Sequence, residues 1–223
     1  MVSLSIIIPT LNESENLEKL LNYLLDNTTE STEIIVVDGG SSDNSVEIVQ
    51  QLKVKVETSD KGRAKQMNKG ALVSKGKRLY FLHADTIPPQ NFENLIFETI
   101  SVAGCFRMKF DKDHWLLNFY SWFTRFNWRV CRGGDRSLFI NKSLFEDLNG
   151  FKDIPLMEDY DIVNRIVADH SFLVMENNLI SSARMYEKYG ILRLQLIYVY
   201  VHLLWFFGED ELELQLKLKN LLD

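Results

Sequence analysis

Four short apolar runs, each followed by a segment with helical spacing, fill residues 1–88 and constrain the fold more than any other feature. The runs are "SLSIIIPT", "TEIIVVDGG", "KVKVET" and "KRLYFLHAD". They are too short for helices, and they carry the β-branched and aromatic residues typical of strands buried on both faces. Strands that alternate with helices predict an α/β protein, with a parallel sheet covered by helices on both sides.

The second half of the chain is less regular. The runs "SLFI" and "SFLVM" predict two further strands, and "EDYDIVNRIVAD" predicts a helix. The terminal run "ELELQLKLK" alternates like a strand, but its acidic start and basic end suit a helix dipole, so we favour a helix. Near the start of the chain, Asn12 and Glu15 have the spacing of a capping box and predict that a helix begins there.

Composition narrows the class of protein. The 223 residues are 46% hydrophobic and 25% charged, as in a globular protein large enough to bury a core. The formal charge of −6 argues against a nucleic-acid partner. Cys105 and Cys131 lack metal-ligand spacing and form no disulfide framework, which favours a cytoplasmic protein. We expect no signal peptide, and no membrane-spanning helix because polar residues interrupt the apolar stretch 191–208.

Polar residues follow each of the four predicted strands, as "PTLNE", "DGGSSD", "DKGR" and "HAD". Ligands of open α/β sheets bind beyond the carboxyl ends of the strands, so these residues are expected to line one crevice. Each also has a simpler interpretation: Asp38 as part of a plain turn, Asn12 as a helix cap, and Arg63 as a solvated residue. Neither a dinucleotide fingerprint nor a P-loop is present to explain the crevice.

Six segments together resemble the family 2 glycosyltransferases with the GT-A fold. They are "SIIIPTLNE", "IIVVDGGSSD", "GRAKQMNKGA", "FLHADT", "GGDRSLFINKSLFEDLNGF" and "PLMEDYDIVNRI". Two of them are similar to a short subgroup named for its genomic association with radical-SAM and selenoprotein-like domains. The resemblance implies one GT-A domain over residues 1–223 with a mainly parallel mixed sheet. It would comprise a nucleotide-binding half (1–88), an acceptor-binding half (89–190), and an apolar C-terminal helix and tail (191–223).

The resemblance also implies a nucleotide-sugar donor, with a UDP-sugar as the expected one. In the family, the acid at Asp38 hydrogen-bonds the base, the loop 9–13 lines the nucleoside, and Arg63 approaches the base or the diphosphate. The residues that the resemblance places at the donor are Pro9, Thr10, Asn12, Glu13, Asp38, Gly39, Arg63, Gln66, His83, Ala84, Asp85, Asp135 and Arg184.

A divalent metal, Mn²⁺ or Mg²⁺, is implied at Asp85, where the family carries an Asp-x-Asp motif. The chain departs from that motif because His83 stands in place of the first acid. Imidazole suits Mn²⁺ better than Mg²⁺, which prefers oxygen ligands. His83 is therefore either a second metal ligand, a contact to the ribose, or a packed histidine at the end of a strand.

The catalytic base implied by the resemblance lies in "MEDYD": Asp159 is assigned to this role, with Glu158 as the alternative. Acids in a first helical turn are also ordinary partners of the helix dipole. Direct displacement assisted by such a base would invert the anomeric configuration. The family often has Gln where this chain has Arg136, so the role of that position is open. The Gln-x-x-Arg-Trp signature of processive synthases is absent.

The segment "HWLLNFYSWFTRFNWRV" is dense in aromatic residues. It is interpreted as an amphipathic helix over the sheet, as a wall of the acceptor site, or as a peripheral membrane contact together with residues 191–208. The acceptor is expected to be a hydroxyl of a metabolite, lipid or glycan, and the apolar C-terminal helix is a candidate homodimer surface. Two other functions stay open: an inactive sugar-nucleotide binding protein, and a nucleotidylyltransferase, which is disfavoured because "PTLNE" is not a glycine-rich loop.

Overall fold

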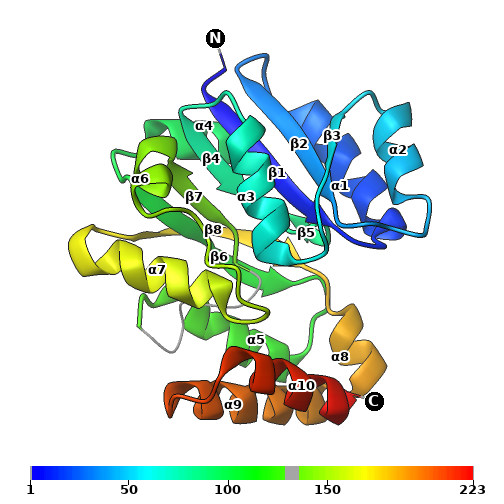
Figure 1. The fold of residues 1–223 in the computed structure, drawn as a ribbon, viewed down its shortest axis with the longest axis vertical. Coiled ribbons are helices and arrows are strands. Elements are labelled where there is room, and N and C mark those ends of the chain that lie inside the picture. Colours follow the sequence, from blue (N-terminus) through cyan, green and yellow to red (C-terminus); the bar gives the residue numbers. More distant parts are fainter. Residues whose placement is uncertain (1, 129–135, 223) are drawn as a thin grey trace.

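An eight-stranded mixed sheet forms the centre of the molecule, in the order β3-β2-β1-β4-β7-β6-β8-β5 (Figure 1). The computed structural model describes residues 2–128 and 136–222. The first four of these strands are parallel, β7 runs antiparallel to β4 and β6, and β6 pairs in parallel with β8. The α/β class and the mainly parallel first half are therefore confirmed.

The parallel half follows the predicted alternation of strand and helix. Its elements are β1 (Leu4–Thr10), α1 (Ser14–Asn27), β2 (Thr32–Asp38), α2 (Ser45–Gln51), β3 (Lys55–Thr58), α3 (Arg63–Val73) and β4 (Arg78–Phe81). All seven residues of β1 are buried, because α1 covers one face of the sheet and α3 the other. Alternate residues of β1 accordingly enter two different cores: Ile6 and Ile8 pack with Leu20 of α1, and Ile7 packs with Met67 of α3.

The second half extends the sheet and adds the helices that lie below it in Figure 1. Its elements are β5 (Thr86–Ile87), α4 (Phe92–Glu98), β6 (Ala103–Phe110), α5 (Trp115–Trp122), the 3₁₀ turn η1 (Phe123–Arg125), β7 (Leu138–Asn141), α6 (Lys142–Asp147), α7 (Glu158–Asp169), β8 (Leu173–Ser181), α8 (Arg184–Tyr189), α9 (Ile191–Phe206) and α10 (Glu211–Leu222). The division of the chain at residues 88 and 190 stays a prediction.

The terminal run is a helix, as favoured from its charge distribution. Leu214, Leu218 and Leu222 of α10 are spaced by four residues and belong to the apolar clusters that α10 forms with α9. This helical spacing of leucines buries one stripe of α10, whereas a strand would have placed all of them on one flat face. Within the described residues, no helix combines the length and the apolar character needed to cross a bilayer.

Two local predictions are wrong. Helix α1 begins at Ser14, and Asn12 does not cap it: Asn12 has a positive φ of 55°, and its Oδ1 accepts a hydrogen bond from the Ser42 N–H at 2.8 Å. The strand predicted over "KRLYFLHAD" ends at Phe81, so His83 and Asp85 lie in the turn that leads to β5.

One of the three interpretations of the aromatic segment was an amphipathic helix over the sheet, and a helix of this segment does pack against β6. Its helix α5 covers only eight residues, and Leu117 is its completely buried apolar side chain. Trp115, Phe119 and Trp122, spaced as one helical stripe, are 74%, 53% and 45% exposed. The aromatic density of this segment therefore serves a surface more than the interior.

Candidate active site

The carboxyl ends of β1 and β2 are fastened together by Gln66 of α3. Its Nε2 donates hydrogen bonds to the backbone carbonyls of Thr10 and Val37, both at 2.8 Å, and the residue is buried. Gly39 follows β2 directly, and a Cβ there would lie 3.0 Å from the Gln66 side chain. Gln66 thus sets the spacing of the two loops, and Gly39 leaves room for it.

The loop after β1 is held by the loop after β2. The N–H of Asn12 donates to Ser41 Oγ at 2.9 Å, the N–H of Glu13 to Ser45 Oγ at 3.0 Å, and the N–H of Ser14 to Asp43 Oδ2 at 3.0 Å. These bonds satisfy N–H groups at the start of α1 that have no partner within the helix. The role of Asp43 was not predicted, although a Ser-Ser-Asp run after a strand is a known turn and capping signal.

Asp43 is the carboxylate on which both loops depend. It also accepts hydrogen bonds from the N–H and Oγ of Ser45, at 3.0 and 2.6 Å, at the start of α2. Burial raises the pKa of this carboxyl group, but the hydrogen bonds from Ser45 and Ser14 outweigh it and lower the pKa from 3.8 to about 2. Asp43 therefore stays ionised at any physiological pH.

Asp38, which is predicted to hydrogen-bond the base of the nucleotide, is buried at the end of β2. Its carboxylate accepts hydrogen bonds from the backbone N–H of Gly40 at 2.9 Å and of Ser41 at 3.0 Å. The side chain thus stabilises the turn, which agrees with the simpler of its two interpretations. Its contact with a base stays a prediction.

Three predicted donor residues from distant parts of the chain form one ion-pair cluster. Arg184, at the start of α8, donates to both carboxylate oxygens of Glu13, with Nη1 2.6 Å from Oε2 and Nη2 in close contact with Oε1. The same Nη2 lies 3.3 Å from Asp85 Oδ2. The cluster therefore joins the loops after β1 and β4 to the N-terminus of α8.

A large open cleft lies over these strand ends, with a volume of about 1220 Å³. From the predicted set it is lined by Pro9, Thr10, Glu13, Arg63, Gln66, His83, Ala84, Asp85 and Arg184. Asn12 and Gly39 lie in the adjoining loops, and Asp135 lies outside the described residues. The opposite wall comes from α10, including Leu212, Leu216 and Lys219. The sequence analysis did not predict that α10 lines the cleft, because the tail carries no motif and its pattern indicated only a helix.

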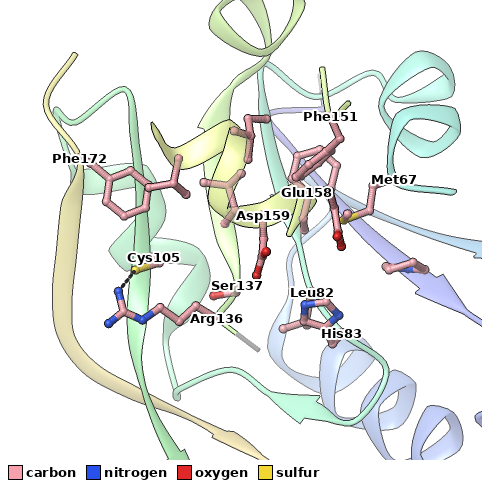
Figure 2. A pocket seen from close by; sticks show the side chains of 15 residues that line it. Met67, Leu82, His83, Cys105, Arg136, Ser137, Phe151, Glu158, Asp159 and Phe172 are labelled. Atoms are coloured by element: carbon pink, nitrogen blue, oxygen red, sulfur yellow. Dashed lines mark hydrogen bonds between the residues drawn. The ribbon is translucent and has the colours of Figure 1, made fainter. Parts of the chain in front are cut away.

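A small enclosed chamber adjoins the cleft, and Pro9 and His83 line both. Its own space is about 30 Å³, enough for one or two water-sized groups. Figure 2 shows the carboxylate of Asp159 pointing into this chamber, with His83 on one side and Ser137 on the other. Asp159, the predicted catalytic base, therefore lines the chamber, and His83 lies between it and the cleft that holds the predicted donor residues.

The two acids that open α7 have different surroundings. Glu158 is almost completely buried, and one of its oxygens forms a close ion pair with Nε of Arg63. Asp159 is more accessible, and its Oδ1 accepts the N–H of Tyr160 at 2.8 Å. Arg63, predicted at the donor, is thus also the counterion of Glu158.

Arg136 is a buried cation at the far side of the chamber (Figure 2). Its Nη2 donates to the carbonyl oxygens of Thr124 and Phe126, and its Nη1 lies 3.8 Å from Sγ of Cys105. Burial raises the pKa of the Cys105 thiol in spite of this cation. Arg136 therefore ties β7 to η1, which is the role that the sequence left open.

The comparisons with known proteins agree with this architecture. The sequence profile of the family described as "Glycosyl transferase family 2" matches residues 5–146, more than half of the chain. The chain belongs to family 2 of the glycosyltransferases. The matched region runs from β1 to α6 and includes Asp38, Asp85 and Arg63, whereas α7 and the C-terminal helices lie beyond it.

Curated relatives match less than half of this family 2 chain. Glycosyltransferase AglE of Haloferax volcanii is 36% identical over 109 residues, covering 45% of this chain and 36% of that protein. Glycosyltransferase GlyG of Streptococcus pneumoniae is 30% identical over 104 residues, covering 44% of this chain and 35% of that protein. The aligned part thus spans about a third of the length of these relatives.

Solved structures share the GT-A fold of this family 2 chain. S. aureus TarS 1-349 in complex with UDP superposes with a TM-score of 0.66 at 18% identity, covering 86% of this chain and 64% of that chain. The mannosyltransferase PcManGT from Pyrobaculum calidifontis, in complex with GDP-Man and Mn²⁺, superposes with a TM-score of 0.60 at 17% identity, covering 80% and 56%. The predicted fold is confirmed, while the association with the radical-SAM subgroup stays a prediction.

Proposed function

We propose that this chain is an inverting, metal-dependent glycosyltransferase that moves a sugar from a nucleotide-sugar, most simply a UDP-sugar, to a hydroxyl acceptor. The observation that carries the proposal is the arrangement of Glu13, Asp85 and Arg184 in one cleft, with Asp159 in the chamber that opens beside it at His83. Family membership supports the reaction class, and the position of the cleft at the carboxyl ends of parallel strands supports a nucleotide ligand.

The donor is inferred from the chemistry of the cleft together with the solved structures. TarS was crystallised with UDP and with UDP-GlcNAc, and PcManGT with GDP-Man. The lining of the cleft includes five cationic side chains, which suit a diphosphate. They are Lys61, Arg63, Lys65, Arg184 and Lys219. A UDP-sugar is the simplest donor consistent with these observations.

The donor set around Asp85 fits a divalent cation only in part. Among the described residues, no three His, Cys, Asp or Glu side chains form a ready-made metal site. Metals that work on nucleotides commonly use one or two carboxylates and complete their shell with phosphate oxygens and water. Asp85, with His83 two residues before it, would hold such an ion, and a bound ion would neutralise charge on the departing diphosphate.

Asp159 is assigned as the general base that takes the proton from the acceptor hydroxyl. Its carboxylate points into the chamber, while Glu158 is bound to Arg63, so Asp159 is the acid that can receive a proton from an acceptor hydroxyl. Attack by that hydroxyl on the face of the sugar opposite the diphosphate breaks the bond to the leaving oxygen and inverts the anomeric centre.

We further infer a peripheral membrane contact. Leu192, Leu196, Val199, Leu203 and Phe206 of α9 lie on one helical stripe and are 46% to 61% exposed. The exposed aromatic stripe of α5 adds Trp residues, which favour the interface between lipid and water, and Arg125 stacks on Trp122 at 4.6 Å. Co-sedimentation with neutral phosphatidylcholine vesicles and with vesicles that also contain an anionic phospholipid tests this, and no binding to either kind would contradict it.

A thermal-shift screen of nucleotide-sugars, with and without Mn²⁺, tests the proposed function together with an assay for release of UDP. We expect a Mn²⁺-dependent rise of the melting temperature with a UDP-sugar, since a ligand of the folded state stabilises it by mass action. Binding without any transfer or slow hydrolysis would instead favour an inactive sugar-nucleotide binding protein. No shift with any nucleotide would contradict both functions.

A further inference from the structure

Asp85, which would hold the divalent cation, already contacts a cation from its own chain. Nη2 of Arg184 lies 3.3 Å from Asp85 Oδ2 and contacts Glu13 Oε1. The two carboxylate side chains are 18% and 19% exposed, while that of Arg184 is 42% exposed. One partly solvated guanidinium thus bridges two less accessible acids.

The electrostatics of this cluster change when a nucleotide diphosphate enters. Without ligand, Arg184 neutralises charge on Glu13 and Asp85, two acids that would otherwise repel each other at the same rim of the cleft. A diphosphate brings further negative charge beside them, which favours a second cation. A guanidinium also pairs with phosphate oxygens as well as it does with a carboxylate.

We propose that Arg184 acts as a placeholder for the divalent cation. It occupies Asp85 and Glu13 in the free protein and weakens the binding of metal alone. When metal and diphosphate arrive together, Arg184 leaves Asp85 and binds the phosphates. The cleft therefore takes up the metal together with the donor and not before it. Glu13 then becomes a second carboxylate near the ion. This would compensate for His83, which stands where the family's Asp-x-Asp motif has its first acid.

The position of Arg184 at the first residue of α8 allows this exchange. The backbone around it is fixed independently of its side chain, by the hydrogen bond from the Ser182 N–H to the Asp85 carbonyl at 3.1 Å and from the Ala183 N–H to Asp111 Oδ1 at 2.9 Å. The guanidinium can therefore move between partners while α8 stays in place. Arg184 lines the same cleft as Glu13 and Asp85, so its side chain stays within the cleft when it changes partner.

The inference rests on the proposed function, and Mn²⁺ titrations separate the two. Free Mn²⁺ is measured by electron paramagnetic resonance for the wild type, Arg184→Met and Arg184→Lys, each with and without UDP. Lys112→Met is the matched control, because Lys112 pairs with Glu187 of the same helix α8 but does not line the cleft. Circular dichroism checks that each variant is folded.

We expect Arg184→Met to bind Mn²⁺ without nucleotide about twofold to fivefold more tightly than the wild type, since half-exposed ion pairs contribute energies of this size. The same variant should bind UDP with Mn²⁺ more weakly, because the contact of Arg184 with phosphate is lost. Arg184→Lys should lie between the two, and Lys112→Met should match the wild type.

Unchanged or weaker Mn²⁺ binding by Arg184→Met without nucleotide would overturn the placeholder role while leaving the proposed function intact, provided that the wild type binds Mn²⁺ with UDP. If the wild type binds no Mn²⁺ even with UDP, metal dependence fails and the placeholder role fails with it. Should Arg184→Met not fold, the Arg184→Lys result decides in the same direction.

Discussion

The parallel half of the sheet and the C-terminal helices use the same aliphatic residues in opposite ways. Leu17, Leu20 and Leu21 of α1 are completely buried against the sheet, whereas Leu192 and Leu196 of α9 are 61% and 60% exposed. The loops of the first region are fixed by hydrogen bonds from backbone N–H groups at residues 12–14 to the side chains of Ser41, Ser45 and Asp43. In contrast, α9 and α10 are held mainly by contact between apolar side chains.

This difference indicates that the two regions have different roles. The parallel half holds most of the buried core and has several of the predicted donor residues at its strand ends. The C-terminal helices contribute one wall of the cleft and an exposed apolar surface, so they are suited to recognition more than to stability. The acids at the start of α7 lie where the two regions meet, since Met157 and Tyr160 pack against α9.

The largest effect is expected at this junction. Asp159→Asn should lower kcat by about 10²–10⁴-fold, because a general base is lost, while the affinity for UDP stays unchanged. Transfer kinetics and calorimetric UDP binding measure the two quantities. Asp169→Asn, at the exposed C-terminal end of the same helix, is the control and should leave both unchanged. A loss of UDP affinity in Asp159→Asn would show that the acid belongs to the donor site.

A pair of leucine truncations compares the two regions directly. Leu20→Ala should lower the free energy of unfolding by about 2–5 kcal/mol, because it empties part of a closed core. Leu196→Ala should change it by less than about 0.5 kcal/mol, as expected for an exposed side chain. Denaturant unfolding measures both. If Leu196→Ala were as destabilising as Leu20→Ala, the outer face of α9 would be buried in solution, for example in a dimer.

The ion pair between Arg63 of α3 and Glu158 of α7 should contribute to the free energy of unfolding by an amount between those of the two leucines. Arg63→Met leaves a buried carboxylate without its counterion and should cost about 1–2 kcal/mol, less than for a fully buried pair because the Arg63 side chain is 39% exposed. Adding Glu158→Gln removes the unpaired charge and should restore at least half of the loss. Equal thermal stabilities of Arg63→Met and the wild type would show that Glu158 has another partner.

As the pH is lowered, the two regions should lose stability at different pH values. Burial lowers the pKa of His202 in α9, whose ring contacts Tyr160 Oη at 2.7 Å. Its folded pKa lies below the usual value near 6.5, so the unfolded state takes up the proton first and stability falls as the pH drops below about 6.5. Asp43 has the lowered pKa of about 2, so its contribution is lost only as the pH falls from 3.8 toward 2.

Hydrogen exchange, corrected for the intrinsic pH dependence of the exchange rate, should therefore show faster exchange in α9 than in α1 when the pH is lowered from 7 to 5. His202→Gln removes the titrating group and should abolish most of this difference. Equal acceleration in both helices would mean that they unfold as one unit and that His202 is not the cause.

Local patterns predicted much of the fold. The apolar runs and the turns after them located the parallel strands, and the charge distribution of the tail identified α10. The errors at Asn12 and at the end of β4 have a common physical reason: the partners that decide these turns are distant in sequence. Asn12 is fixed by Ser42, thirty positions along the chain, and nothing in "PTLNESEN" reveals that contact.

The sequence predicted which residues lie near one another better than it predicted their contacts, and their roles stay predictions. The positions at the strand ends brought Glu13 and Asp85 to one cleft, but the sequence did not reveal that Arg184, 171 positions from Glu13, bridges them. Nor did it separate Asp159 from Glu158, because only the tertiary structure shows that Arg63 pairs with Glu158. Such pairings depend on how α3, α7 and α8 pack, which no local spacing encodes.

Calorimetric titration of UDP into the wild type and Asp85→Asn, each with Mn²⁺ and with a chelator, tests the central claim most directly. We predict that Mn²⁺ increases the affinity of the wild type for UDP by at least about tenfold, as expected when a cation joins a carboxylate to a diphosphate. Asp85→Asn should bind UDP weakly and equally in both conditions. If Asp85→Asn kept the full gain from Mn²⁺, the metal would lie elsewhere and Asp85 would not hold the leaving group.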